Sequence, residues 1–167
     1  MGLLFYQSMD FDETTFFKKR GITRSVTSLL KLGYDPEHTR GNYTGEAIVI
    51  PHYWHGRLVG YQERWIGSDK PNNIPKYTNT KDFPKGTTLY NYDNVSAQQD
   101  VVVVESAMTV AYLMSLGIAS IATFGASIQP EQIRLIKNLC SVGNRVLLSF
   151  DNDQAGLKAT EKIVGQL

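Results

Sequence analysis

Two short apolar runs, each followed at once by acidic residues, stand out in the pattern of hydrophobic and polar positions along this chain. Residues 101–104 are four valines followed by Glu105, and residues 145–150 run through Leu-Leu-Ser-Phe to Asp151. Short runs that are rich in Val and Leu and lack a helical period are typical of buried parallel strands. The sequence therefore predicts a strand at each run, with its acid at the carboxyl end.

The second half of the chain alternates between strand-like and helical patterns. Pro130 begins one of the helical segments, in the first turn, where its missing N–H costs nothing. Three consecutive βα units predict an α/β fold, with a parallel sheet, right-handed crossovers and helices flanking the sheet. The predicted strands are residues 101–104, 118–124 and 145–150, and the predicted helices are residues 107–116, 130–139 and 155–164.

The first half has a different pattern, which predicts a smaller α+β subdomain. We expect a helix at residues 12–20 and a second that begins after Thr23 and ends at Gly33. Strand-like runs at residues 47–51 and 58–66 predict a hairpin. From Gly67 to about Tyr92 the chain has neither a helical nor a strand period. Irregular stretches of this length are usually functional or disordered. The polar stretch at residues 94–100 places the expected domain boundary between residues 95 and 96, giving domains at 1–95 and 96–167.

Composition narrows the class of protein. With 167 residues, of which 42% are hydrophobic, the chain can bury a core. Its single cysteine excludes a disulfide framework and a cysteine-rich zinc module. The start is not signal-like and there is no long apolar run, so we expect a cytoplasmic protein without a membrane partner. A net charge of +1 means that nucleic-acid binding would require a local basic patch.

The acids at the strand ends predict a magnesium site. Carboxyl ends of parallel strands meet at one edge of a sheet, so Glu105, Asp151 and Asp153 are expected to converge there. Asp151 and Asp153 flank one residue, and in an extended backbone both would point to the same side. Carboxylates suit Mg²⁺, which makes these three residues candidate metal ligands and candidate catalytic residues. The alternative is that strand-end acids only cap the helices that follow.

The irregular stretch contains a local basic patch. Five basic residues stand against two acidic ones between residues 64 and 85, with three aromatic residues among them. Basic side chains that neutralise phosphates, together with aromatic rings on which bases stack, are what single-strand binding needs. A solvated loop, with its aromatic rings anchored in the core, is the alternative. The residues are Arg64, Lys70, Lys76, Lys81 and Lys85, with Asp69 and Asp82, and the aromatic Trp65, Tyr77 and Phe83.

Several of these motifs resemble a known family. Glu105 after its strand, and the later run Phe-Asp-Asn-Asp-Gln-Ala-Gly at residues 150–156, resemble the TOPRIM domain of bacterial-type primases, topoisomerases and some nucleases. Four upstream blocks resemble, in order, the segments that precede TOPRIM in the RNA-polymerase core of DnaG-type and phage primases. These blocks are Ile50-Pro51 and residues 60–64, 75–79 and 83–90.

The resemblance implies a DNA primase-type nucleotidyltransferase, which uses Mg²⁺ or Mn²⁺ to make short RNA primers from NTPs on a single-stranded DNA template. It implies that Asp151 and Asp153 hold metal, while Glu105 either holds metal or takes the proton from the attacking hydroxyl; both roles stay open. It also implies a replicative helicase as partner, or fused helicase and zinc-binding domains. The residues implied to contact nucleic acid or nucleotide are Arg64, Lys76, Tyr77, Asn79 and Lys85.

One motif departs from the family. Primases usually carry Glu-Gly-x-x-Asp after the first strand, whereas here Ser106 replaces the glycine and Thr109 the aspartate. Two further hypotheses stay open: a TOPRIM nuclease, in which the same ions activate water, and a non-catalytic TOPRIM module that binds DNA or a partner, for which Thr109 would be a sign of lost chemistry. Since the sequence ends at Leu167, without the further segments of a primase core, we expect a fragment or minimal form of a larger replication protein. The abbreviated motifs suggest a phage or mobile-element origin.

Overall fold

The structure is a computed structural model that describes residues 15–67 and 71–166. Contacts divide these residues into two units, and the chain passes from one to the other after His52, Arg57 and Phe83. The first unit contains residues 15–52 and Leu58–Phe83, apart from residues 68–70, and the second contains Tyr53–Arg57 and residues 84–166.

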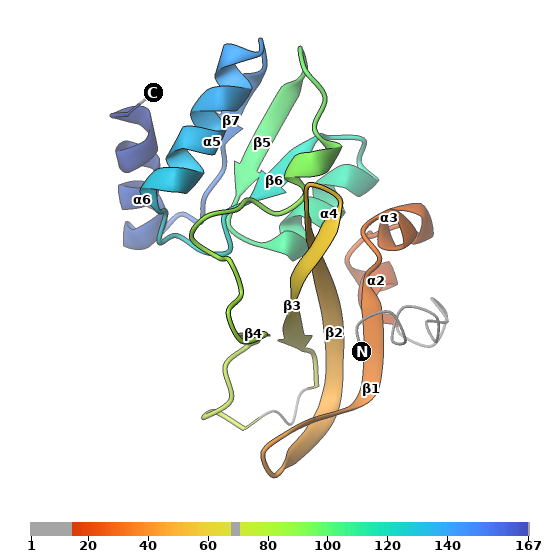
Figure 1. Ribbon diagram of the computed structural model, residues 1–167. Coiled ribbons are helices and arrows are strands. Elements are labelled where there is room, and N and C mark those ends of the chain that lie inside the picture. Colours follow the sequence, from red (N-terminus) through yellow and green to blue (C-terminus); the bar gives the residue numbers. More distant parts are fainter. Residues whose placement is uncertain (1–14, 68–70, 167) are drawn as a thin grey trace. The chain divides into compact units, whose positions relative to one another are not determined.

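The second unit has the predicted order of three βα repeats. Its three strands form a parallel sheet in the order β6-β5-β7, with Val102 of the central strand opposite Ser120 on one side and Leu147 on the other. In a sheet of this order, two crossovers of the same hand place α4 on one face and α5 on the other. Figure 1 shows the arrangement. The elements are β5 (Asp100–Val104), α4 (Ala107–Ser115), β6 (Ser120–Ala122), α5 (Pro130–Ser141), β7 (Arg145–Leu148) and α6 (Gln154–Val164).

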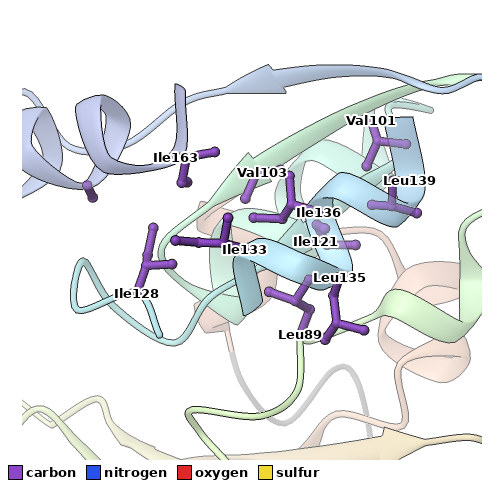
Figure 2. Close-up of a cluster of buried hydrophobic side chains, with 11 residues drawn as sticks. Leu89, Val101, Val103, Ile121, Ile128, Ile133, Leu135, Ile136, Leu139 and Ile163 are labelled. Atoms are coloured by element: carbon purple, nitrogen blue, oxygen red, sulfur yellow. The ribbon is translucent and has the colours of Figure 1, made fainter. Parts of the chain in front are cut away.

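A hydrophobic cluster holds α5 and α6 against this sheet (Figure 2). Val101 and Val103 point to the same face of β5, and both are fully buried in the cluster with Ile121 of β6. From the helices, Ile136 and Ile163 are also fully buried. Burying an aliphatic side chain of this size contributes about 1.5–3 kcal/mol. The cluster therefore fixes the positions of all three strands, and with them the edge at which the acids lie.

The first unit is built from two short helices and an antiparallel sheet. The predicted hairpin is confirmed, and its turn at His55 and Gly56 has positive φ angles of 49° and 72°, as tight hairpin turns require. The sheet order is β1-β2-β3-β4. The elements are α2 (Thr15–Lys19), α3 (Arg24–Leu29), β1 (Gly33–Arg40), β2 (Tyr43–Trp54), β3 (Arg57–Trp65) and β4 (Tyr77–Asn79).

The outer strands of this sheet were not predicted from the sequence. β1 reads Gly-Tyr-Asp-Pro-Glu-His-Thr-Arg and has no alternating apolar pattern, because it is an edge strand with a register shift between Asp35 and His38. β4 is only three residues long and lies in the stretch that has no period. The helix expected at residues 12–20 begins within the described residues at Thr15, and its first three positions lie outside them.

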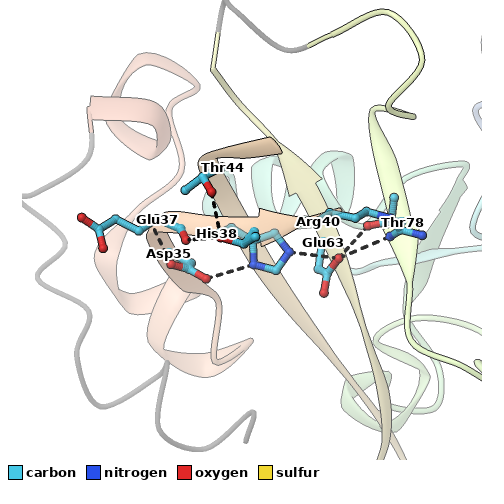
Figure 3. A network of polar contacts seen from close by, with 8 residues as sticks. Asp35, Glu37, His38, Arg40, Thr44, Glu63 and Thr78 are labelled. Carbon is cyan, nitrogen blue, oxygen red and sulfur yellow. Dashed lines mark hydrogen bonds and ion pairs between the residues drawn. The ribbon is translucent and has the colours of Figure 1, made fainter. Parts of the chain in front are cut away.

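A polar network ties β1, β3 and β4 together (Figure 3). The His38 ring lies between two carboxylates, with Nδ1 2.9 Å from Asp35 Oδ2 and Nε2 3.2 Å from Glu63 Oε2. Thr78 on β4 donates its hydroxyl to the same Glu63 oxygen at 2.6 Å. β1 and β3 are not neighbours in the sheet, so His38 links them across β2. The network joins β3 and β4, the strands that carry Arg64 and Tyr77.

Residues 84–95, expected in the N-terminal domain, lie in the second unit by contacts. Leu89 is fully buried in its core, and the Tyr90 N–H donates to the carbonyl of Ala122 at 2.8 Å. The predicted domain boundary between residues 95 and 96 is not tested by these contacts and stays a prediction.

Among the described residues, no helix has the length and apolar character that crossing a membrane would need.

Candidate active site

Two strands of the second unit deliver acids to one edge of the parallel sheet. Glu105 directly follows β5, and Asp151 comes three residues after the end of β7. The Asp151 backbone N–H donates to Glu105 Oε1 at 3.1 Å, so the two strand ends are joined by a hydrogen bond. The structure thus brings Glu105 and Asp151 together, as the strand pattern predicts.

Asp153 is placed differently from the expectation. Its backbone N–H donates to the Asp151 carbonyl at 2.8 Å, so the segment turns instead of continuing as an extended strand. Its Oδ1 accepts the Gly156 N–H at 2.8 Å and caps α6. Asp153 itself keeps extended backbone angles, with φ −130° and ψ 176°, so the turn lies between the two aspartates, and their projection to one side stays a prediction. Capping occupies Asp153 Oδ1, and its second carboxylate oxygen remains for another ligand.

Gly156 permits this turn. A Cβ atom at this position would lie 2.0 Å from the carbonyl oxygen of Asp151 and 3.0 Å from its carbonyl carbon. Real Cβ atoms do not approach backbone this closely, so the acidic turn and the first turn of α6 pack together only around a glycine.

The charges at this edge repel one another. Burial raises the pKa of the Glu105 carboxyl, the hydrogen bond from the Asp151 backbone lowers it, and the negative charges of Asp151 and Asp153 raise it further. The net effect is a raised pKa. The edge therefore favours a bound cation or a proton over three free carboxylates.

Replacing Glu105 with Gln should raise the melting temperature of the metal-free protein at neutral pH. Because the pKa is raised in the folded state, ionisation of Glu105 opposes folding, and this cost appears as the pH rises through the ordinary and then the raised pKa. Gln keeps the acceptor for the Asp151 N–H and removes the charge. We expect a rise of about 1–3 °C at pH 7 that disappears below about pH 4.

Thermal melts in EDTA at both pH values would check this expectation. Glu161→Gln, the same exchange at an exposed residue of α6, should change little. A lower melting temperature for Glu105→Gln at pH 7 would show that repulsion at this edge does not oppose folding.

Ser106 and Thr109 occupy the positions at which the sequence departs from primases. Ser106 Oγ accepts the Thr109 N–H at 3.2 Å and so caps α4. The two hydroxyl oxygens are 2.9 Å apart and hydrogen-bond each other. This pair supplies no fourth carboxylate next to Glu105.

The acidic edge has suitable donors for a metal ion but not a closed cage. Within residues 15–67 and 71–166, no three His, Cys, Asp or Glu side chains are grouped so that they could hold an ion as they stand. Mg²⁺ usually takes one or two carboxylates and completes its shell with water and substrate phosphates. The oxygen donors and the mutual repulsion of the acids therefore fit Mg²⁺ with part of its shell supplied from outside the protein.

A second group of candidate residues lies in the first unit, around the side chain of Arg64. Its guanidinium donates through Nη1 to the Tyr77 hydroxyl and lies 5.0 Å from the centre of the Tyr77 ring. Phe16 lies on α2, with its ring centre 5.4 Å from the Arg64 guanidinium and 4.0 Å from that of Arg20. We call these four residues, Phe16, Arg20, Arg64 and Tyr77, the basic cluster.

The electrostatics of the basic cluster suit an anion. Burial lowers the pKa of Arg20, the positive charge of Arg64 lowers it further, and Tyr77 raises it. Arg64 is only 8% exposed, and its buried Nε has no hydrogen-bond partner among the described residues. The exposed Arg20 guanidinium, with the positive charge of Arg64 beside it, is suited to bind a phosphate group.

The remaining predicted nucleic-acid residues are less closely grouped. Lys76 and Asn79 are exposed on and beside β4, and Asn79 Oδ1 accepts the side-chain amide of Gln62 at 2.9 Å. Lys85 is exposed in the second unit. Lys70 and Asp69 lie outside the described residues.

Two of the three aromatic residues between residues 64 and 85, Trp65 and Phe83, pack against other rings of the first unit. Trp65 is 3% exposed and packs against His38 and Tyr43, so it offers no open face for a base. Phe83 packs against His52 in the first unit. For these two rings the anchoring alternative fits the structure better than base stacking.

Phe16 and Arg20 were not among the predicted site residues. Phe16 lies in the first turn of α2 and Arg20 directly follows its last residue, four positions later, a spacing that places side chains on one face of a helix. The sequence offered that signal, but their approach to Arg64 joins segments more than 40 residues apart and could not be inferred from it.

Comparisons with known proteins agree with this arrangement. Residues 102–167 match the family model described as Toprim-like. The DNA primase of Synechococcus elongatus is 33% identical over 131 residues, which is 73% of this chain and 18% of that primase. A DnaG catalytic core has a TM-score of 0.75 and 22% identity, covering 98% of this chain and 63% of that one. A DnaG primase catalytic domain bound to ssDNA has a TM-score of 0.70 and 23% identity, covering 95% of this chain and 63% of that one.

Proposed function

The chain carries a TOPRIM domain of the DnaG primase type at residues 102–167, and on this premise we propose that it is a primase-type nucleotidyltransferase core. It would synthesise short RNA primers on single-stranded DNA, with Mg²⁺ or, in its place, Mn²⁺. The observation that supports this most is the meeting of Glu105 and Asp151 at the carboxyl edge of the sheet.

The acids of this edge would hold the metal. Asp151 and the second oxygen of Asp153 are the proposed ligands, with Glu105 as a third. When bound, the ion would neutralise phosphate charge and position the reacting groups, which is most of what phosphoryl transfer requires. Glu105 has a second proposed role, because a carboxyl with a raised pKa is suited to accept the proton of an attacking hydroxyl.

The basic cluster would bind a phosphate of the template or nucleotide. Arg20 supplies an exposed guanidinium, Arg64 adds positive charge beside it, and the Tyr77 ring lies against the Arg64 guanidinium. Lys76, Asn79 and Lys85 are proposed to add exposed contacts. The similar DnaG catalytic domain was solved with ssDNA bound, which supports DNA as a ligand here.

Replacing Arg64 with Met should weaken binding of a labelled oligothymidylate about tenfold at low salt. Loss of one phosphate contact should also reduce the slope of log Kd against log salt by about 1. Fluorescence anisotropy over a salt series would measure both quantities. Arg145→Met, at an exposed residue of the second unit, is the control and should leave both unchanged. Equal slopes for the Arg64 variant and wild type would exclude a phosphate contact at Arg64.

The proposed activity is tested with the full-length protein, a single-stranded template, NTPs and Mg²⁺. The expected product is short RNA that requires template and disappears in EDTA. No RNA in the presence of metal and template would overturn the proposal. Nicking of DNA without added NTPs would instead indicate the nuclease alternative, in which the same acids serve hydrolysis.

We propose that the chain acts as part of a longer replication protein. It spans 18% of the length of the Synechococcus elongatus primase and 63% of the DnaG catalytic core. A helicase partner, or fused helicase and zinc-binding domains, and a phage or mobile-element source belong to the same proposal.

A further inference from the structure

A buried glutamine on α5 makes more hydrogen bonds than helix packing needs. Gln132 is 0% exposed, and its Nε2 lies 2.9 Å from the carbonyl oxygen of Lys85 and 3.0 Å from those of Thr88 and Thr123. Its Oε1 accepts the Gln129 N–H at 3.1 Å, which completes a capping box at the start of α5. The two N–H groups of Nε2 are thus shared among three carbonyls, and both polar atoms of this side chain are used.

Two of these bonds hold an irregular segment, residues 84–88, which we call the lysine strap. Apart from turns such as the Thr88 hydroxyl bond to the Pro84 carbonyl at 2.7 Å, the strap belongs to no helix or strand. Buried carbonyls require donors, and for Lys85 and Thr88 the donor is the Gln132 amide. The strap therefore takes its position from α5.

The strap places the Lys85 ammonium beside Gly125, in the loop that follows the carboxyl end of β6. A Cβ atom on Gly125 would lie 3.6 Å from Lys85 Nζ, so the ammonium lies beside this glycine. The Gly125 N–H in turn donates to the Glu105 carbonyl at 2.9 Å. The third carbonyl that Gln132 contacts belongs to Thr123, which lies two residues before Gly125. One amide thus fixes both the strap and the loop that connects to Glu105.

We propose that Gln132 is a positioning residue that holds Lys85 beside the loop after β6, at the carboxyl end of the parallel sheet, where the Lys85 ammonium contacts a phosphate of a bound nucleoside triphosphate. The ligand rests on the proposed function, whereas the positioning rests on the contacts alone. An exposed lysine on an irregular segment loses side-chain entropy when it binds, and a fixed backbone limits the further cost of ordering the strap.

The test is a double-mutant cycle in the full-length protein, with a fluorescent ATP analogue and Mg²⁺ as the probe. Gln132→Met has a similar length but no N–H donors, and should weaken the affinity about fivefold to tenfold. Lys85→Ala should weaken it by a similar factor, and the double variant should bind no more weakly than Lys85→Ala. A full additional loss from Gln132→Met in the Lys85→Ala background would overturn the proposal.

A second readout separates positioning from general loss of fold. The rate at which an acetylating reagent modifies Lys85, measured by mass spectrometry, should change in Gln132→Met while the rate at Lys158 on α6 does not. Gln132→His retains an N–H donor and should bring the Lys85 rate part of the way back to the wild-type rate. This variant also replaces the Met variant in the test if the Met variant does not fold. An unchanged Lys85 rate in folded variants would overturn the positioning role. Unchanged affinity in Lys85→Ala, with an altered Lys85 rate in Gln132→Met, would overturn only the nucleotide as ligand.

Discussion

Replacing Asp151 with Asn is expected to reduce Mg²⁺-dependent primer synthesis by the full-length protein by about a hundredfold or more. Asn has nearly the same shape but lacks the negative charge that a metal ligand at this edge would provide. The hydrogen bond that joins the strand ends uses the backbone N–H of Asp151, not its side chain, so the exchange should leave it intact. The loss should therefore occur without a large change in melting temperature.

Product gels with radiolabelled NTPs would measure the yield of this variant. Asp93→Asn is a matched control, because Asp93 is exposed and Asn can still accept the Gly56 N–H that Asp93 accepts at 2.9 Å. The control should synthesise primers normally. Normal primer yield from Asp151→Asn would remove this residue from the proposed catalytic site.

Gly156→Ala is expected to have the largest effect on stability, about 2–4 kcal/mol. The added methyl group would lie 2.0 Å from the Asp151 carbonyl oxygen, which is backbone and cannot rotate away. Relief requires the acidic turn to move away from the first turn of α6. That movement would weaken the Asp153 cap, whose bond to the Gly156 N–H is 2.8 Å long. We expect primer synthesis to be lost as well, because Asp151 and Asp153 both lie on this turn.

Chemical denaturation would give the change in the free energy of unfolding. Gly165→Ala tests the same exchange at the other end of α6, where φ is −68° and the added Cβ atom would meet the Glu161 carbonyl oxygen at 3.2 Å. That variant should be destabilised far less. Equal stability of Gly156→Ala and wild type would show that the turn does not need a glycine.

The parallel sheet could be predicted because each of its strands is a short apolar run followed by a helical period. The edge strands β1 and β4 could not, since neither has an alternating apolar pattern. Both are held partly by side-chain contacts, such as those of His38 and Thr78 with Glu63, that join distant positions. Contacts between distant positions cannot be predicted from local patterns of apolar residues.

The candidate site was predictable to a similar extent. The meeting of Glu105 and Asp151 follows from the rule that parallel strands end at one edge. The turn at Asp153 does not follow from that rule, because whether the backbone stays extended depends on the helix cap and on Gly156. Gln132 carried no signal, since a glutamine on an amphipathic helix is usually a solvated residue.

The hydroxyl pair at Ser106 and Thr109 bears on how a metal ion would be held at the acidic edge. It replaces a glycine and a carboxylate of the primase motif, and its two oxygens bond each other at 2.9 Å. A site with fewer carboxylates depends more on substrate phosphates to complete the metal shell. The non-catalytic module is the alternative in which the acidic edge holds no metal at all.

The most direct test of the carboxylate site is a calorimetric titration of Mn²⁺ into the metal-free, full-length protein. The proposed site predicts saturable binding in the micromolar to millimolar range, which Asp151→Asn abolishes and Asp93→Asn retains. If wild-type protein binds no more Mn²⁺ than Asp151→Asn at millimolar metal, the acidic edge is not a metal site and the proposed chemistry is wrong.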